Sequence, residues 1–270
     1  MSAVTPVQVG GVAVGGPDLV LIAGPCVLEG AEATLRLAED LRALCARLDL
    51  PLIFKASFDK ANRTSLGSFR GPGLEEGLAI LARIQREVGL PITTDVHLPA
   101  QAAPVAEVAD LLQVPAFLCR QTDLLVACAA AGRPVNVKKG QFVAPDAMGA
   151  VLAKLAPGRA ILTERGTSFG HGDLVVDYRG LPLMRALGVP VCMDATHACQ
   201  RPPMGGPSTG GLRAMIPVLA RAAVAVGVDA LFLEVHPDPE HAPCDGPNML
   251  PLAELEPLLR SALAIRGALR

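Results

Sequence analysis

The sequence predicts an α/β protein in which eight parallel strands close into one barrel surrounded by helices. Short β-branched runs alternate with Ala- and Leu-rich stretches of helical period along the whole chain. With 51% hydrophobic and only 3% aromatic residues, the core is aliphatic, as in buried parallel sheets. An open doubly wound sheet is the alternative, but eight successive units without a break in composition favour a single (β/α)8 TIM barrel, which typically needs about 250 residues.

Eight strand candidates follow one another along the chain. They span 19–25, 52–57, 92–96, 111–116, 135–139, 160–166, 190–197 and 230–236. The helices are expected between them, most clearly at 31–48, 73–88, 122–131, 210–226 and 251–269. Four prolines stand just before strands, where the missing N–H costs least: Pro51, Pro91, Pro134 and Pro190.

The first 18 residues fall outside the eight units. The segment VQVGGVAVGG predicts a small hairpin that caps the bottom of the barrel. No Ser/Gly linker or charge run suggests a further domain. We therefore expect an N-terminal extension over 1–18 and one catalytic barrel over 19–270.

Composition excludes several classes of function. The net charge of −2 does not favour nucleic acid or an anionic membrane as a partner. The N-terminus lacks the basic start and apolar core of a secretory signal, and no apolar run reaches the roughly 18 residues of a membrane span. Seven dispersed cysteines without a CxxC pair indicate reduced thiols. We expect a cytoplasmic protein.

Polar and reactive residues gather where the predicted strands end. These are Cys26, Lys55, Ser57, Asp95, His97, Gln113, Lys138, Arg165, His197, Glu234 and His236. Any one of them has an ordinary explanation as a solvated or packed side chain, but the bias extends over all eight strands. Because barrel active sites lie at the carboxyl ends of the strands, the pattern predicts an enzyme.

One group within this set predicts anion binding. The cations Lys55, Lys60, Arg63, Lys138 and Arg165 stand at or just beyond strand ends in a protein of negative net charge. Converging cations and backbone N–H groups are what phosphate and carboxylate ligands require. The loop KANRTSLGSFRGPG at 60–73 is typical of a phosphate clamp.

A second group suggests a metal site. Cys26, His197 and Glu234 end the first, seventh and eighth strands, which become neighbours when a barrel closes, and Asp245 follows the eighth. One thiolate, one imidazole and two carboxylates suit a borderline divalent ion. The spacing alone is a weak signal, because a single buried Cys or His is more often a packed core residue.

Several segments together resemble the 3-deoxy-D-manno-octulosonate 8-phosphate synthases. The resemblance runs from about residue 19 to 262 and includes IAGPCVLE (22–29), FKASFDKANRTSLGSFRGPG (54–73), TDVH (94–97), FLCRQTDLL (117–125), NVKKGQF (136–142), DATHACQ (194–200), FLEVHPDPEHAPCDGPN (232–248) and LPLAELEPLL (250–259). KANRTS is the most specific piece, since the related heptulosonate 7-phosphate synthases carry a KPRTS-type loop.

The resemblance implies a role for each matching residue. Phosphoenolpyruvate would be held by Lys60, Lys138 and Arg165, assisted by Lys55, Ser57, Gln113 and the backbone near Pro115 and Ala116. Arabinose 5-phosphate would be bound by Asn62, Arg63 and Thr64, near a subunit interface of a homotetramer. Asp95 and His97 would orient substrate or transfer protons, and neither is assigned as the base. Lys60, Lys138, His197 and Cys26 are the candidate catalytic residues, and His197 also faces the substrate.

The resemblance also implies a metal-dependent class. Cys26, His197, Glu234 and Asp245 match its ligands for a divalent ion such as zinc, iron, manganese or cobalt. The metal-independent branch has Asn at the first of these positions. The loop CDGPN around Asp245, however, also resembles that branch.

The implied reaction is an aldol-like condensation of phosphoenolpyruvate with arabinose 5-phosphate and water, in the formation of the inner sugar of lipopolysaccharide. Three alternatives remain: a heptulosonate synthase that accepts erythrose 4-phosphate, a metal-dependent phosphosugar aldolase, and a catalytically inactive phosphosugar-binding protein. Asn62 argues against the first. The number of cations exceeds what one phosphate needs, which argues against the second, and the intact ligand set argues against the third.

Overall fold

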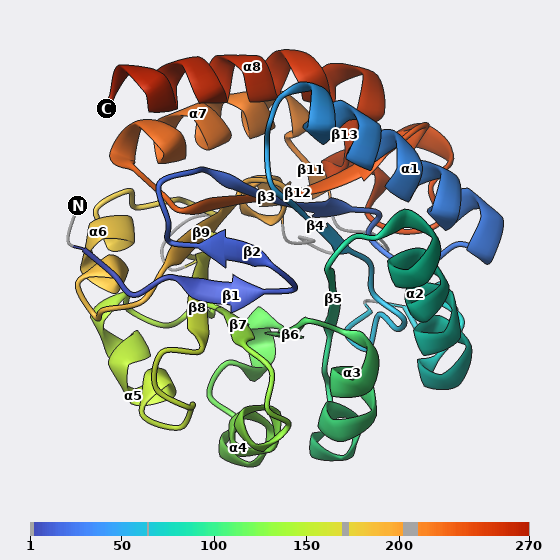
Figure 1. The fold of residues 1–270 in the computed structure, drawn as a ribbon, viewed down its shortest axis with the longest axis horizontal. Helices are drawn as coiled ribbons and strands as arrows, with labels where there is room; N and C mark the ends of the chain where they lie inside the picture. Colours follow the sequence, from blue (N-terminus) through green and yellow to red (C-terminus); the bar gives the residue numbers. More distant parts are fainter. Residues whose placement is uncertain (1–2, 64, 169–172, 202–209, 270) are drawn as a thin grey trace.

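The computed structural model describes residues 3–63, 65–168, 173–201 and 210–269. Within these residues the chain forms a closed parallel barrel surrounded by helices (Figure 1). The barrel strands are β3 (Val20–Gly24), β4 (Leu52–Lys55), β5 (Ile92–Asp95), β6 (Leu111–Val114), β7 (Val135–Lys138), β8 (Ala160–Glu164), β9 (Val191–Asp194) and β12 (Ala230–His236). They pair in chain order, and β12 closes the barrel by pairing with both β3 and β9. The predicted barrel is confirmed.

Helices occupy the outside of the barrel. They are α1 (Ala31–Arg47), α2 (Leu74–Val88), α3 (Ala102–Val108), α4 (Thr122–Ala130), α5 (Gly149–Leu152), α6 (Gly180–Arg185), α7 (Ile216–Val226) and α8 (Leu252–Ala268). In the part of the chain that the structure describes, no helix combines the length and the hydropathy needed to span a membrane.

The connections at the carboxyl ends of the strands contain short elements. Among them are the 3-10 helices η2 (Ala116–Leu118), η4 (His197–Cys199), η6 (Pro239–His241) and η7 (Gly246–Asn248), the antiparallel pair β10 (Gln200–Arg201) and β11 (Gly210–Gly211), and β13 (Leu250–Pro251), which is parallel to β12. The remaining 3-10 helices are η1 (Pro99–Gln101), η3 (Asp146–Met148) and η5 (Arg213–Met215).

One helix boundary differs from the prediction by more than one residue. The expected helix over 210–226 begins only at Ile216, because Gly210 and Gly211 pair with β10 and a 3-10 turn follows. Pro217 then stands in the first turn of α7, where its missing N–H is tolerated.

The N-terminal residues form the expected hairpin. Its strands β1 (Val7–Val9) and β2 (Val12–Val14) are antiparallel and lie across the barrel opening (Figure 1). Val7, Val9 and Val14 are buried in one cluster with side chains inside the barrel. An added side chain at Gly10 would meet Pro91, just before β5, so the hairpin covers the amino ends of the strands. Whether 1–18 and 19–270 behave as separate units stays a prediction.

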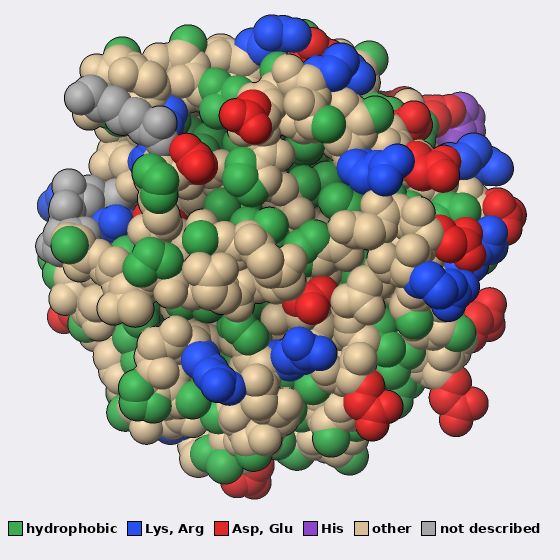
Figure 2. All heavy atoms as spheres, viewed as in Figure 1, with side chains coloured by type: hydrophobic (Ala, Val, Ile, Leu, Met, Phe, Trp, Pro, Cys, Tyr) green, Lys and Arg blue, Asp and Glu red, His purple; other side chains and the backbone are tan. Residues whose placement is uncertain are grey.

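The face that carries the hairpin is closed. Figure 2, drawn from the same side, shows uncharged and hydrophobic atoms over its middle, with side chains of both charge signs gathered over α1 and α2. Arg83 on α2 pairs there with Glu32 on α1. The open end of the barrel is therefore the opposite one.

Two layers of side chains fill the inside of the barrel. The lower layer is apolar: Ile22, Ile53, Leu111, Ile161, Cys192 and Phe232 pack with the hairpin. Two residues further along their strands, the upper layer is polar: Lys55, Gln113, Thr163, Asp194 and Glu234. The intervening residues, such as Phe54, Leu112 and Leu233, pack outward against the helices. This alternation aims polar side chains into the open end of the barrel.

Candidate active site

A cavity of about 820 Å³ lies at the carboxyl ends of the strands. The following predicted site residues line it: Lys55, Lys60, Asn62, Arg63, Asp95, Gln113, Pro115, Ala116, Lys138, Arg165, His197, Glu234 and Asp245. Cys26 and Ser57 are buried beside it, and Thr64 lies outside the described residues. Barrel closure thus brings together residues that are more than 200 positions apart.

Glu234 lies at the centre of a buried charge cluster. Its Oε1 accepts a 2.5 Å hydrogen bond from Lys55 Nζ and lies 3.6 Å from Lys60 Nζ. Lys55 also donates to the carbonyl of Cys26 at 2.9 Å. Burial alone would raise the pKa of Glu234, but Lys55, followed by His197 and Lys60, holds it well below its usual value. Glu234 is therefore an anion, and Lys55 is its fixed partner.

Asp194 joins two candidate catalytic groups. Its Oδ2 lies 2.6 Å from Lys138 Nζ and 2.7 Å from His197 Nδ1. The other ring nitrogen of His197, Nε2, lies 3.5 Å from Glu234 Oε1. Burial opposes the charge of Asp194, but His197 and Lys138 hold its pKa well below its usual value. Asp194 therefore orients both groups toward the cavity.

The ring of Phe232 lies beneath the Lys138 ammonium. Nζ is 3.7 Å from the ring centroid, which allows a cation–π interaction. Burial lowers the pKa of Lys138, although Asp194 opposes this shift. Lys138 thus keeps a partly desolvated charge against the cavity, and such a charge attracts an anionic ligand more strongly than a solvated one.

A row of hydrogen bonds crosses the barrel beneath the cavity. Ser57 Oγ and Gln113 Nε2 each donate to Asp95 at 2.5 Å. Asn136 donates in turn to Gln113 Oε1 at 3.1 Å, and Thr163 donates to Asn136 Oδ1 at 2.7 Å. Burial opposes the charge of Asp95, but the nearby lysines, Lys55 first, hold its pKa well below its usual value. The row runs from Ser57, just after β4, to Thr163 on β8, and it holds Asp95 as an anion.

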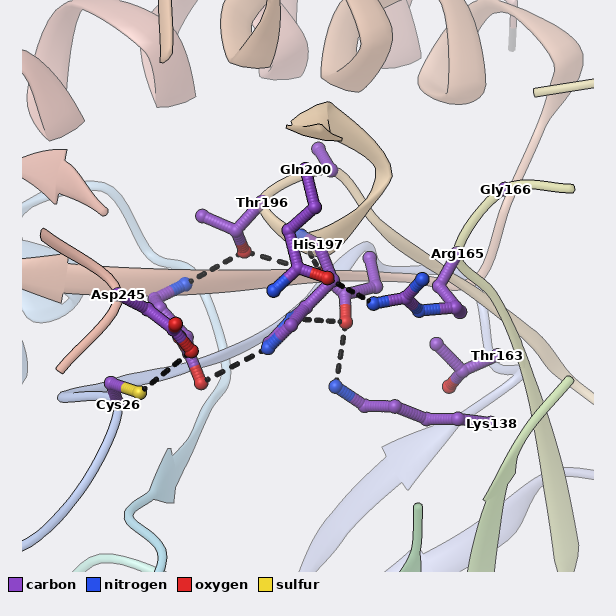
Figure 3. Close-up of polar contacts among 12 residues, drawn as sticks. Cys26, Lys138, Thr163, Arg165, Gly166, Thr196, His197, Gln200 and Asp245 are labelled. Carbon is purple, nitrogen blue, oxygen red and sulfur yellow. Dashed lines mark hydrogen bonds and ion pairs between the residues drawn. The ribbon is translucent and has the colours of Figure 1, made fainter. Parts of the chain in front are cut away.

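Arg165 is a buried cation with spare donor capacity. Its NH2 donates to Gln200 Oε1 at 2.6 Å (Figure 3), while its buried NH1 has no hydrogen-bond partner among the described residues. Glu164 holds the backbone in place by accepting from the N–H groups of Arg165 and Gly166. An unpaired buried guanidinium N–H is satisfied by an anion, so Arg165 fits the predicted role.

Five potential metal ligands lie beside Lys60 and Arg63. The ligand atoms of Cys26, Cys244 and Asp245 lie within 4.8 Å of one another, and so do those of His197, Glu234 and Asp245. Cys26 Sγ is 3.3 Å from Asp245 Oδ2, and Figure 3 shows the Cys26 sulfur pointing toward Asp245. Sulfur, imidazole and carboxylate donors suit a borderline divalent ion, so the residues present fit the expected group.

Burial dominates the state of the Cys26 thiol. It raises the pKa of Cys26 well above its usual value, and the contact with Cys244 and the charge of Glu234 add to this shift. Burial would lower the pKa of Lys60, but Cys26 and then Glu234 raise it well above its usual value. A cation near Cys26 therefore counteracts the main obstacle to forming its thiolate.

Sequence reasoning missed three residues at this site: Asp194, Gln200 and Cys244. Asp194 and Gln200 begin and end the DATHACQ segment, and Cys244 directly precedes Asp245. Their positions beside predicted residues were the available signal. Their contacts form only when the barrel closes, and the spacing of residues along the sequence does not predict such contacts.

Comparison with known proteins agrees with this geometry. A model of the DAHP synthetase I family matches residues 4–264. A Synechococcus protein named 2-dehydro-3-deoxyphosphooctonate aldolase is 59% identical over 94% of this chain and 90% of its own length. Proteins of the same name from Nitratidesulfovibrio vulgaris (60% identical over 91% of each chain) and Pelobacter propionicus (55% over 98% of each) are similar throughout. The chain therefore belongs to the DAHP synthetase I family and, within it, to the 2-dehydro-3-deoxyphosphooctonate aldolases.

Proposed function

We propose that this enzyme condenses phosphoenolpyruvate with D-arabinose 5-phosphate and water, giving 3-deoxy-D-manno-octulosonate 8-phosphate and phosphate. It is a transferase that forms a carbon–carbon bond, and its product serves lipopolysaccharide sugar synthesis. The observation that carries the proposal is the convergence of Lys60, Lys138 and Arg165 on one cavity lined by strand ends. The names of the relatives, at 55–60% identity, support the same reaction.

Phosphoenolpyruvate brings a phosphate and a carboxylate to neighbouring carbons. Lys60, Lys138 and Arg165 are the cations that would receive them, with the backbone near Pro115 and Ala116 along one wall. Lys55 and Ser57 act differently, because each already contacts a carboxylate of the protein. They support the site by positioning Glu234 and Asp95.

Arabinose 5-phosphate would enter on the side of the KANRTS loop. Asn62 and Arg63 line the cavity there, and Thr64 would supply a hydroxyl. The Arg63 side chain is 20% exposed and approaches Asp245 at 3.8 Å, so it reaches both solvent and the reaction centre. A homotetramer would place a subunit interface near this loop. Phe117, on the cavity wall, is an exposed hydrophobic side chain at this end of the barrel.

In the reaction, C3 of phosphoenolpyruvate bonds to the aldehyde carbon, water adds to C2, and the C2–O bond to phosphate breaks. The protein's cations neutralise the phosphates and the carboxylate of the two substrates. By binding these anions they also keep C3 of phosphoenolpyruvate close to the aldehyde carbon. Lys138 is kept in place by Asp194 and Phe232 throughout. His197, oriented by Asp194, presents Nε2 beside Glu234 for a proton or a ligand.

A divalent ion such as zinc, iron, manganese or cobalt would be held by Cys26, His197, Glu234 and Asp245. When bound, such an ion supplies Lewis-acid polarisation or a more acidic water. The two overlapping donor groups support this proposal. All seven cysteines are free thiols, which supports a reducing compartment, and we place the enzyme in the cytoplasm.

The heptulosonate synthase reaction is the nearest alternative, because the matching family model carries that name. Asn62 in KANRTS and the names of the relatives favour the octulosonate synthase. The two differ in the acceptor sugar phosphate, which can be tested directly.

The test mixes the purified enzyme with phosphoenolpyruvate and either arabinose 5-phosphate or erythrose 4-phosphate, before and after EDTA treatment. Loss of the enol absorbance measures turnover. We expect turnover with arabinose 5-phosphate, its loss after EDTA, and its return with a divalent ion. Preference for erythrose 4-phosphate would overturn the proposed acceptor. Full activity of a protein shown by metal analysis to be metal-free would overturn the metal requirement alone.

A further inference from the structure

Cys244 belongs to the active site but has no role in the function proposed above. Its side chain is 2% exposed, and its Sγ lies 2.9 Å from the Sγ of Cys26. Together with Asp245 these two thiols form one of the two groups of potential metal ligands. The two sulfurs come from residues 218 positions apart, on opposite sides of the seam where β12 meets β3.

Packing does not explain where the Cys244 sulfur points. Cys26, Val27, Cys244 and Met249 form a small buried cluster, which would be satisfied by any small apolar side chain. The sulfur of Cys244 is instead directed at polar groups, because Arg63 NH1 approaches it at 2.9 Å. The sulfur therefore faces the groups that line the cavity, Arg63 and Asp245 among them.

The predicted four ligands do not form one compact set by themselves. Cys26 is grouped with Cys244 and Asp245, whereas His197 and Glu234 form their own group with Asp245. Asp245 is common to both groups. Its backbone has a φ of +49°, an uncommon conformation for a residue with a side chain, and it stands next to Cys244. Cys244 and Asp245 therefore stand side by side in one turn, where Asp245 belongs to both ligand groups and Cys244 to the group of Cys26.

We propose that Cys244 supplies a second thiolate to the metal site. This rests on the proposed function and extends it, because a donor set with two sulfurs, carboxylates and an imidazole is softer than the expected one. Soft sulfur ligands favour zinc, cadmium or ferrous iron over manganese and magnesium. Cys244 thereby makes the site more selective among divalent ions. Arg63, which contacts Cys244, also lies where the acceptor phosphate would bind.

Cadmium measures the number of thiolates directly, through ultraviolet thiolate-to-metal charge-transfer absorbance. The full-length enzyme is stripped of metal, kept reduced with a phosphine, and titrated with Cd²⁺ alongside Cys244→Ser, Cys26→Ser and Cys45→Ser. Cys45 is a matched control, because it is equally buried but lies in the outer core on α1. We expect the absorbance per bound ion to fall to about half in each active-site variant and to be unchanged in Cys45→Ser. In competition with a chelator, the affinity of Cys244→Ser for Cd²⁺ should also be lower than that of the parent by about 10-fold or more.

Unchanged absorbance per bound ion in Cys244→Ser would overturn the inference. Circular dichroism and the thermal midpoint of each metal-free variant establish that it is folded, and Cys244→Ala repeats the test with a smaller side chain. Turnover of phosphoenolpyruvate with arabinose 5-phosphate, measured on the same parent sample, tests the function separately. A two-thiolate signal without turnover would refute the function alone, whereas turnover with a one-thiolate signal would refute the role of Cys244.

Discussion

The two ends of this barrel are built from the same strands and have opposite chemistry. On β4, Ile53 packs beneath the cavity in the apolar layer, while Lys55, two residues later, contacts Glu234. On β12, Phe232 and Glu234 show the same change. The hairpin closes the apolar end, and the cavity opens at the polar end. The comparison teaches that stability and catalysis can be assigned to successive inward-facing positions of one strand.

Removing a charge from the upper layer should have the largest effect. For Lys138→Met we expect kcat/KM to fall about 10³-fold, because a desolvated cation facing the cavity is lost while side-chain volume is nearly kept. Steady-state kinetics measure this. Lys154→Met, a surface lysine bonded to Thr122, is the matched control and should keep parental kinetics. A loss of less than tenfold in Lys138→Met would contradict a role in anion binding.

Removing volume from the lower layer should instead reduce stability. Ile53→Ala is expected to lower the free energy of unfolding by about 3 kcal/mol, since the side chain is fully buried between the hairpin and the barrel. Denaturant unfolding measures the change, and Ile53→Val should cost about 1 kcal/mol. Well below the unfolding transition, kcat/KM should stay close to the parental value. A large catalytic loss would show that the two layers are not independent.

Asp194→Asn should separate orientation from charge within the upper layer. The amide keeps the size of the side chain but cannot balance Lys138 and His197, so we expect activity to fall about 10- to 100-fold. Asp177→Asn, a surface carboxylate paired with Arg179, is the control. If Asp194→Asn keeps the parental kinetics, the orientation of His197 does not depend on the Asp194 carboxylate.

The smallest expected effect concerns His97, which lines the cavity and packs edge-on against Phe58. Burial lowers its pKa, although Asp95 and Asp59 oppose the shift. As pH falls, His97 therefore binds a proton in the unfolded chain before it does so in the folded protein. The free energy of unfolding decreases as pH falls below the unfolded pKa of about 6.5. His97→Gln should lose less stability between pH 7 and about pH 5. Urea unfolding at the two pH values measures the difference, and equal losses in both proteins would contradict it.

The fold was largely predictable, because each strand carries its own signal. Prolines 51, 91, 134 and 190 directly precede β4, β5, β7 and β9, as expected. The start of α7 was predicted six residues too early, since a helical period does not reveal that Gly210 and Gly211 pair with another strand. The hairpin over the bottom of the barrel was also predicted, and the structure confirms it.

The site was predictable as a location and less so as a set of contacts. Strand ends identified the residues that surround the cavity, and their individual roles stay predictions. Lys55 was assigned to substrate, yet its ammonium contacts Glu234 and the Cys26 carbonyl. Asp194 was missed, although it contacts both Lys138 and His197.

By itself, the sequence determined the barrel, the end at which the chemistry lies and the family. Those properties follow from local periodicity and from motifs that occupy consecutive residues. Only the tertiary structure decided which groups are partners, as in the contact of Cys26 with Cys244 or of Lys55 with Glu234. The reason is physical: these pairs form across the seam where β12 meets β3, and a buried charge or thiol takes its partner from whatever closure brings within reach.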